Sequence, residues 1–218
     1  HSSGFFSVYS LPPNQAVSVD SQRRINEKRK QTPPKRDICS LILRKTRTLL
    51  KNSNQETRQA LGRVVDDAVL LTEPSHHTSQ IASGSVSLVV TSPPFLDVVN
   101  YKADNWLRCW FCGIDTENVA ITQLSNLEDW KAEMTRVFRE LRRVLKRGAY
   151  VAFEVGEVRS GTIRLEEHVI PCGIEAGLRA ELVMVNAQSF TKTANCWGVE
   201  NNSKGTNSNR IVVFRKGR

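Results

Sequence analysis

Apolar residues follow a helical period most clearly between Glu128 and Leu145. One stripe of this segment contains Trp130, Met134, Val137, Phe138, Leu141, Val144 and Leu145, and lysines and arginines occupy the opposite side. This spacing predicts an amphipathic helix, and Gly148 is the residue type that commonly follows a helix end. The apolar run from Ala149 to Val155 then predicts a buried strand.

Further segments of the same two kinds lie on both sides of this pair. An earlier strand is predicted at Val86–Val90, because a double proline stops the apolar run soon after it. Later in the chain, the pattern predicts a helix over Leu165–Ala176 closed by Gly177, a strand over Glu181–Ala187 and a last strand over Arg210–Arg215. Strands that alternate with helices predict an α/β fold, with helices flanking a sheet.

The first part of the chain is polar and basic. Residues 1–36 show no clean periodicity, and we expect a basic N-terminal arm or connector there, with a short helix between Val19 and Gln31. Asp37 is placed as the N-cap of a helix that begins the second domain, residues 37–218. We interpret Arg63–Leu71 as a short strand followed by an acidic turn.

The net charge and the cysteines indicate which partner and which redox environment to expect. The formal net charge is +9, with the cations crowded into the first quarter of the chain, which favours a polyanion such as nucleic acid over a merely solvated surface. Five scattered cysteines favour a reduced protein. No apolar stretch approaches the ~20 residues that cross a bilayer, so we expect a cytoplasmic, nucleoid-associated protein.

The first residues of the chain and a pair of adjacent histidines lead to two further expectations. The opening His1-Ser2-Ser3-Gly4 resembles the remnant of a purification tag, so the natural protein is expected to begin upstream. His76 and His77 have no cysteine or carboxylate at ligand spacing, so no metal site is expected.

The candidate chemistry lies in Thr91-Ser92-Pro93-Pro94-Phe95, at the carboxyl end of the strand that begins at Val86. Ligands of open α/β sheets bind at that edge. Two prolines stiffen the loop, so that the Ser92 hydroxyl and the Pro93 carbonyl can accept hydrogen bonds beside the flat ring of Phe95. This set suits a planar ring with an exocyclic amine. The alternative is a proline-rich turn after an ordinary core strand.

A strand followed by Ser-Pro-Pro-Phe resembles the catalytic motif of the S-adenosylmethionine-dependent exocyclic-amino methyltransferases that act on DNA. The resemblance covers residues 63–216 and implies a Rossmann-like methyltransferase sheet, mostly parallel, with an antiparallel C-terminal strand. It implies methyl transfer from S-adenosylmethionine to a DNA base, and the serine form is closer to the N4-cytosine branch than to the N6-adenine branch. The implied catalytic residues are Ser92, Pro93, Pro94 and Phe95, and the implied cofactor contacts include Thr91 and Ser92.

Other residues are candidates for holding the donor or the base. Asp67-Ala68 matches the end of a Gly-Asp-Ala motif that helps to hold the adenine of the donor in that family, although Asp66 replaces the glycine. The segment after the proline loop offers Asn100, Tyr101, Asn105 and Arg108 for a base pocket, unless it is a packing helix. The long polar loop that follows Ser189 offers Lys192, Trp197 and Lys204.

The glycine-rich turn that binds the donor in this family is missing, because no two of the twelve glycines are separated by a single residue. Three accounts stay open. A donor half precedes residue 1 in a longer protein, a second polypeptide supplies it, or the chain is a noncatalytic subunit that binds nucleic acid or serves as a scaffold. A change of substrate to N6 of adenine or to RNA is a further alternative.

Overall fold

The computed structural model describes residues 19–30, 32, 35, 37–94, 96, 101–102, 105, 109, 112–119, 121–122, 124–158, 162–187 and 208–217. The chain divides into two compact units, one of His1–Leu70 with Ala103–Gly113 and one of Leu71–Lys102 with Ile114–Arg218. The second unit contains the sheet and is called the sheet unit. The predicted domain boundary after residue 36 stays a prediction.

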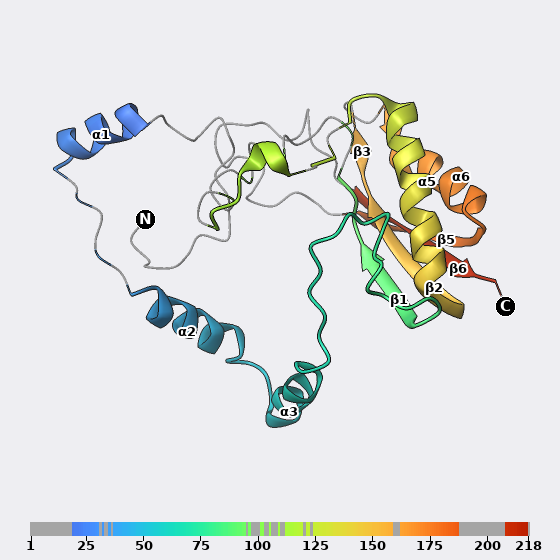
Figure 1. Cartoon of the computed structure of the whole chain (residues 1–218), viewed down its shortest axis with the longest axis horizontal. Coiled ribbons are helices and arrows are strands. Elements are labelled where there is room, and N and C mark those ends of the chain that lie inside the picture. The colour runs from blue at the N-terminus through green and yellow to red at the C-terminus, as the bar shows by residue number, and fades with distance from the viewer. Residues whose placement is uncertain are drawn as a thin grey trace. The chain divides into compact units, whose positions relative to one another are not determined.

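The sheet unit is built on four strands, β1 (Val86–Thr91), β2 (Leu145–Val155), β5 (Leu178–Ala187) and β6 (Ser208–Lys216). Their order across the sheet is β1-β2-β6-β5 (Figure 1). β1 and β2 are parallel, while β6 is antiparallel to both β2 and β5. β1, β2 and β5 therefore run in one direction, with the C-terminal strand reversed between two of them. This arrangement confirms the predicted α/β class with an antiparallel C-terminal strand.

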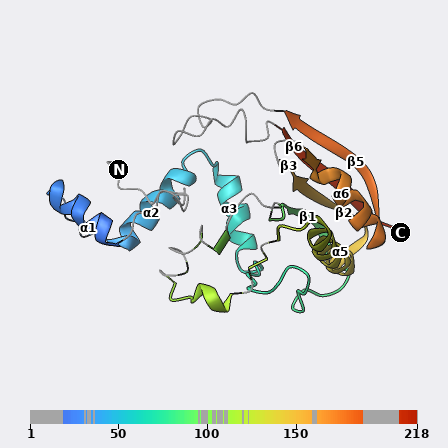
Figure 2. The same ribbon diagram turned by 90° about the horizontal axis from the view of Figure 1, so that it is seen from above.

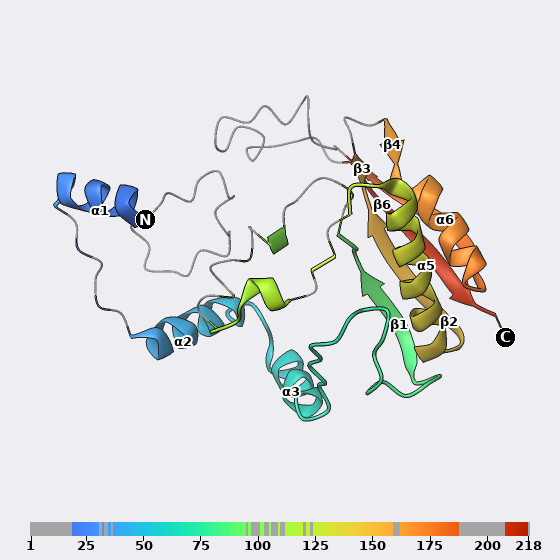
Figure 3. The same ribbon diagram turned by 45° about the horizontal axis from the view of Figure 1, so that its top comes forward.

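Two helices cover one face of this sheet. α5 (Leu127–Val144) connects β1 to β2, and α6 (Leu165–Glu175) precedes β5. They lie side by side against the same face (Figure 2 and Figure 3). The short strands β3 (Glu157–Val158) and β4 (Ile163–Arg164) form a separate two-stranded ladder between β2 and α6 (Figure 3).

The core lies between these helices and the sheet. Phe138 of α5 is fully buried, and its ring centroid lies 4.7 Å from that of Phe153 on β2 and 4.9 Å from that of Phe214 on β6. Alternate residues of β2 that face α5, including Val151 and Val155, are also fully buried. Each such side chain contributes about 1.5–3 kcal/mol through removal from water, which fixes α5 on the sheet.

The helical stripe and the start of β1 were predicted closely, whereas the starts of β2 and β5 were predicted late. β2 begins at Leu145 instead of Ala149, and β5 begins at Leu178 instead of Glu181. Leu178 pairs with Lys216 of β6. The strand start therefore depends on a partner almost forty residues away, and the local apolar pattern does not contain that information.

The other unit contains α1 (Val19–Lys28), α2 (Ile38–Leu49) and α3 (Gln55–Val64). Asp37 caps α2 as predicted, because its Oδ1 accepts a hydrogen bond from the amide of Cys39 at 3.0 Å. The short strand predicted at the start of Arg63–Leu71 is wrong, whereas the acidic turn predicted after it is present at Asp66 and Asp67. Asn54 caps α3, and this helix includes Arg63 and Val64, while the residues that follow form a turn.

Hydrogen bonds to an ion pair of α5 join the segment before β1 to this helix. Oε1 of Glu140 accepts hydrogen bonds from the amide and hydroxyl of Thr78 at 2.8 and 2.6 Å. Arg143 donates to both oxygens of Glu140 and to the carbonyls of Thr78 and Ile81. These bonds lower the pKa of Glu140 to about 2, with the Arg143 bond as the largest cause and burial acting against it. We call Thr78, Glu140 and Arg143 the α5 clamp.

The other face of the sheet is uncovered within the described residues. Leu88 and Val90 of β1 are 58% and 74% exposed, and Met184 of β5 is 54% exposed. The described part of the chain also provides no strand beyond β1 on that edge. Sheets with parallel strands normally carry helices on both faces, so this sheet presents an open edge and an open apolar face.

Candidate functional site

The proline loop follows β1 directly, as predicted. Thr91 is the last residue of β1 and lies opposite Phe153 of β2. Ser92 is exposed, and Pro93 and Pro94 are half-buried. The Ser92 hydroxyl therefore lies at the carboxyl end of a parallel strand, open to solvent, where open α/β sheets bind their ligands.

A hydrogen bond from α5 holds this loop in place. Nε1 of Trp130 donates to the carbonyl oxygen of Pro94 at 3.0 Å, and Trp130 is only 2% exposed. Leu96, two residues beyond Pro94, is fully buried in the core. The loop is thus fixed by the end of β1 before it, by an indole bond within it and by a core side chain after it.

The start of α5 is itself positioned by a local signal. Asn126 caps the helix, with its Oδ1 accepting from the amides of Glu128 and Asp129 at 2.7 and 3.2 Å. Trp130 lies in the next turn and reaches across to the loop. The sequence placed Trp130 on the apolar stripe of the helix, but no pattern in it indicated that the indole nitrogen bonds to Pro94.

A shallow apolar hollow lies beside the loop. It is lined by Pro94, Thr122, Leu124, Trp130 and Met134, and has an empty volume of about 200 Å³ including space open to solvent. About 200 Å³ is thus an upper bound on the enclosed space, and it already lies below the about 300–1,000 Å³ of typical ligand pockets. The hollow is therefore too small to hold a nucleoside or a whole S-adenosylmethionine molecule with the described residues alone.

A buried ion pair lies at the same end of the sheet. Nε of Arg210 lies 2.7 Å from Oε1 of Glu166, and both side chains are at least 85% buried. Arg210 lies opposite Val155 at the end of β2 and Val185 near the end of β5. Oε2 of Glu166 is buried and has no hydrogen-bond partner among the described residues. Sequence reasoning missed this pair, because its members are forty-four residues apart and neither belongs to a motif.

The structure describes only some of the predicted site residues. Thr91, Ser92, Pro93 and Pro94 lie together at the end of β1. Phe95, Asn100, Arg108, Lys192, Trp197 and Lys204 lie outside the described residues.

Three other predicted residues, Tyr101, Asn105 and Asp67, are described. Tyr101 and Asn105 are helical and half-buried. Asp67 is exposed in the turn after α3, where its amide donates to the carbonyl of Val64 at 3.2 Å. It belongs to the unit that does not contain the proline loop, so its role towards a donor stays a prediction.

The described residues contain no group of three or more histidine, cysteine or acidic side chains placed to hold a metal ion. In the same residues, no helix has both the length and the apolar character that crossing a membrane requires.

Comparison with known proteins gives similarity of fold only. No family model and no curated protein matches the sequence. Among solved structures, the chain is similar to TTHA0409, a proposed DNA modification methylase from Thermus thermophilus, with 20% identity, coverage of 64% of this chain and 48% of that chain, and a TM-score of 0.40. A second structure of that protein, in complex with S-adenosyl-L-methionine, matches with 20% identity over 63% of this chain and 48% of that chain, at a TM-score of 0.38.

A third solved structure is a SAM-dependent methyltransferase from Methanosarcina mazei. It has 12% identity to this chain, and the match covers 66% of this chain and 65% of that chain at a TM-score of 0.36. The present chain spans about half the length of the Thermus protein. Similarities at this level carry no argument about ligands or activity, since one fold supports many functions.

Proposed function

We propose that this chain is the target-base half of an S-adenosylmethionine-dependent methyltransferase that acts on an exocyclic amine of a DNA base, with N4 of cytosine as the preferred target. One observation carries the proposal. An exposed Ser92 stands at the carboxyl end of β1 in a Ser-Pro-Pro loop that Trp130 and Leu96 hold in place. Such a loop presents oxygen acceptors in a fixed position, as the orientation of an amine requires.

In this proposal the chain orients the amine. The Ser92 hydroxyl and the Pro93 carbonyl accept hydrogen bonds from the NH₂ group, while the ring of Phe95 stacks on the base. The Pro94 carbonyl already accepts a bond from Trp130, so its part is to fix the loop. S-adenosylmethionine supplies an electrophilic methyl group when bound. The amine is the nucleophile, and its surplus proton passes to solvent, so none of the cysteines is needed.

The described residues do not fit a complete donor site. The hollow beside Pro94 is too small, and the sequence has no glycine-rich turn. We therefore assign donor binding to a further half of the sheet, which is either a preceding segment or a second polypeptide. The open edge of β1 and the exposed Leu88 and Val90 support this assignment, because one added parallel strand and its helix would cover both.

A noncatalytic nucleic-acid-binding or scaffold subunit is the second candidate. The net charge of +9 and the lack of a glycine-rich turn favour it over an enzyme complete in one chain. N6 of adenine and RNA are the alternative targets of the enzyme. These candidates make different predictions about donor binding and about the methylated product.

The test is methyl transfer from labelled S-adenosylmethionine by the protein purified from its native source with any bound partner. Duplex DNA and duplex RNA serve as substrates, and the product base is identified by mass spectrometry. Ser92→Ala is expected to lower transfer about 100-fold or more, as loss of a positioning group does. Ser75→Ala is the matched control, because Ser75 is an exposed serine of the segment before β1.

The outcomes separate the candidates. Transfer retained by Ser92→Ala would refute the site. Absence of donor binding in calorimetry, with or without a bound partner, would favour the noncatalytic subunit. Methylated adenine, or transfer to RNA alone, would replace the preferred target by one of the alternatives.

A further inference from the structure

Six cations gather at the end of the sheet opposite the proline loop. They come from the last turn of α5, the start of β2, the start of β5 and the end of β6, which meet at the amino end of the parallel strands. We call them the basic cluster, and its members are Arg142, Lys146, Arg147, Arg179, Arg215 and Lys216.

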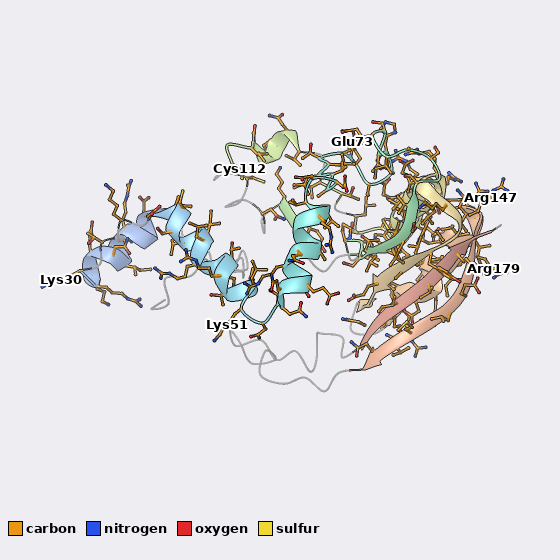
Figure 4. All side chains as sticks on the ribbon, turned by 90° about the horizontal axis from the view of Figure 1, so that it is seen from below. Lys30, Lys51, Glu73, Cys112, Arg147 and Arg179 are labelled. Carbon is orange, nitrogen blue, oxygen red and sulfur yellow. The ribbon has the colours of Figure 1, made fainter. Side chains whose placement is uncertain are left out.

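Several observations show that these side chains converge. Arg179 and Arg215 are direct cross-strand partners on β5 and β6. The pKa of Lys216 is lowered, first by burial and then by the positive charges of Arg142 and Arg147 nearby. Arg147 and Arg179 lie at the same end of the sheet, with their side chains directed away from the ribbon (Figure 4). The cluster therefore spans four neighbouring elements at one end of the sheet.

Most of these cations bond to neutral groups. Arg142 and Arg215 donate to the carbonyls of Gly177 and Gly148, both at 3.3 Å, Lys216 donates to the carbonyl of Leu145 at 2.7 Å, and Lys146 donates to the hydroxyl of Ser87 at 3.0 Å. Among the described residues, Glu181 is the carboxylate paired with a member of the cluster, through Arg179. The positive charge of this surface is thus largely uncompensated.

Other cations of α5 are paired with carboxylates, so uncompensated charge is not general along this helix. Lys131 is paired with Glu128, Arg136 with Glu133 and Arg139 with Glu175, at 2.9, 2.8 and 2.8 Å. These three form a control set with compensated charge on the same helix. Within α5 and the strands beside it, positive charge without a carboxylate partner is therefore concentrated at the last turn of the helix and at the neighbouring strand ends.

We propose that the basic cluster binds the phosphate backbone of a nucleic acid. Adjacent strands lie about 4.8 Å apart, so the cluster presents cations at a spacing of a few ångströms, and a duplex presents about one charge per 1.7 Å of its axis. Arginine guanidinium groups bind phosphate oxygens through two parallel donors. Phosphate contacts of this kind carry no sequence information, so the cluster contributes affinity and position.

The proposed surface is separate from the candidate active site. Val155 lies eight positions after Arg147 along β2, which corresponds to roughly 26 Å of strand. The cluster therefore contacts a nucleic-acid segment other than the one that presents a base to Ser92. Because the cluster acts without the donor, this inference stands whether or not the chain transfers methyl groups.

The test compares two triple variants of the full chain that remove the same charge. R142Q/K146Q/R147Q removes three of the six cations of the cluster, none of them paired with a carboxylate among the described residues, and K131Q/R136Q/R139Q removes all three cations of the control set. Affinity for a duplex of about 30 base pairs is measured by fluorescence anisotropy without S-adenosylmethionine, across a range of salt concentrations. DNA and RNA duplexes of the same sequence identify the source of the phosphate backbone, and poly-glutamate stands for an acidic protein partner.

For the cluster variant, the slope of log Kd against log salt is expected to fall by about 2.7, because each lost phosphate contact removes about 0.9. The control variant is expected to keep the slope of the parent protein. Equal changes in both variants, no change in either, or an effect on poly-glutamate alone would overturn the inference. Absence of duplex binding by the parent chain would overturn it as well.

A single variant guards against misfolding. If the triple variant fails to fold in circular dichroism, Arg147→Gln replaces it, since Arg147 is exposed, and its expected change in slope is about 0.9. The binding assay contains no S-adenosylmethionine, so a failure of methyl transfer by the parent chain does not alter its result, and the two proposals can fail separately.

Discussion

Replacing Glu140 by glutamine tests how the α5 clamp positions the segment before β1. The carboxylate accepts hydrogen bonds from Thr78 and from Arg143 and is only 9% exposed. Glutamine keeps the size of the side chain but removes its charge and supplies one acceptor oxygen instead of two. The variant therefore leaves Arg143 without its anion, in a site that holds the chain leading to β1 and Ser92.

The expected magnitude follows from the pKa of Glu140. The fall from the ordinary value of 4.5 to about 2 corresponds to about 3.5 kcal/mol at about 1.4 kcal/mol per unit. Arg143 is 35% exposed, so solvent screens part of this interaction, and we expect Glu140→Gln to lower the free energy of unfolding by about 2 kcal/mol near pH 7.

The pH dependence has a defined sign. A carboxylate with a lowered folded-state pKa stabilises the protein above its unfolded value of 4.5, and the contribution is lost as the pH falls from there through about 2. The difference between the parent and Glu140→Gln is therefore expected to shrink between pH 4.5 and about pH 2.

Urea unfolding near pH 7 and near pH 3.5 measures both effects. Glu175→Gln is the matched control, because Glu175 pairs with Arg139 while both side chains are about 60% exposed, and such a pair contributes at most about 1 kcal/mol. A cost for Glu140→Gln no larger than that of Glu175→Gln would refute the reasoning. A difference that stays constant as the pH falls would refute the assignment to the carboxylate charge.

Two further sets of variants test the loop anchor and the packing of α6. Trp130→Phe keeps an aromatic ring in the core but loses the bond to Pro94, so urea unfolding should show a loss of about 1 kcal/mol together with reduced methyl transfer; an unchanged variant would contradict the anchor. Gly173→Ala would place a Cβ against the ring of Phe214 and should cost about 1–3 kcal/mol. Gly62→Ala, in open space on α3, should raise helix stability by about 0.5–1 kcal/mol, and the opposite order in thermal unfolding would contradict the packing.

Much of the candidate site was predictable, because its main signal is local. An apolar run that stops at two prolines marks both the end of β1 and the edge where Ser92 is exposed. The bond from Trp130 to Pro94 was not predictable, since it joins residues thirty-six positions apart. The same applies to Glu166 and Arg210, which meet because β6 enters the sheet beside β2.

Within the sheet unit, the sequence by itself determined that α5 is helical and β2 extended, and which faces they bury, as the stripe of α5 and the apolar run of β2 show. These properties depend on residue periods of 3.6 and 2, and each period can be recognised within one element. Only the tertiary structure decided that β6 lies between β2 and β5, that one face of the sheet is uncovered by the described residues, and that the basic cluster forms. The order of the strands brings distant parts of the chain together, and the residue period within one strand does not indicate which other strand it pairs with.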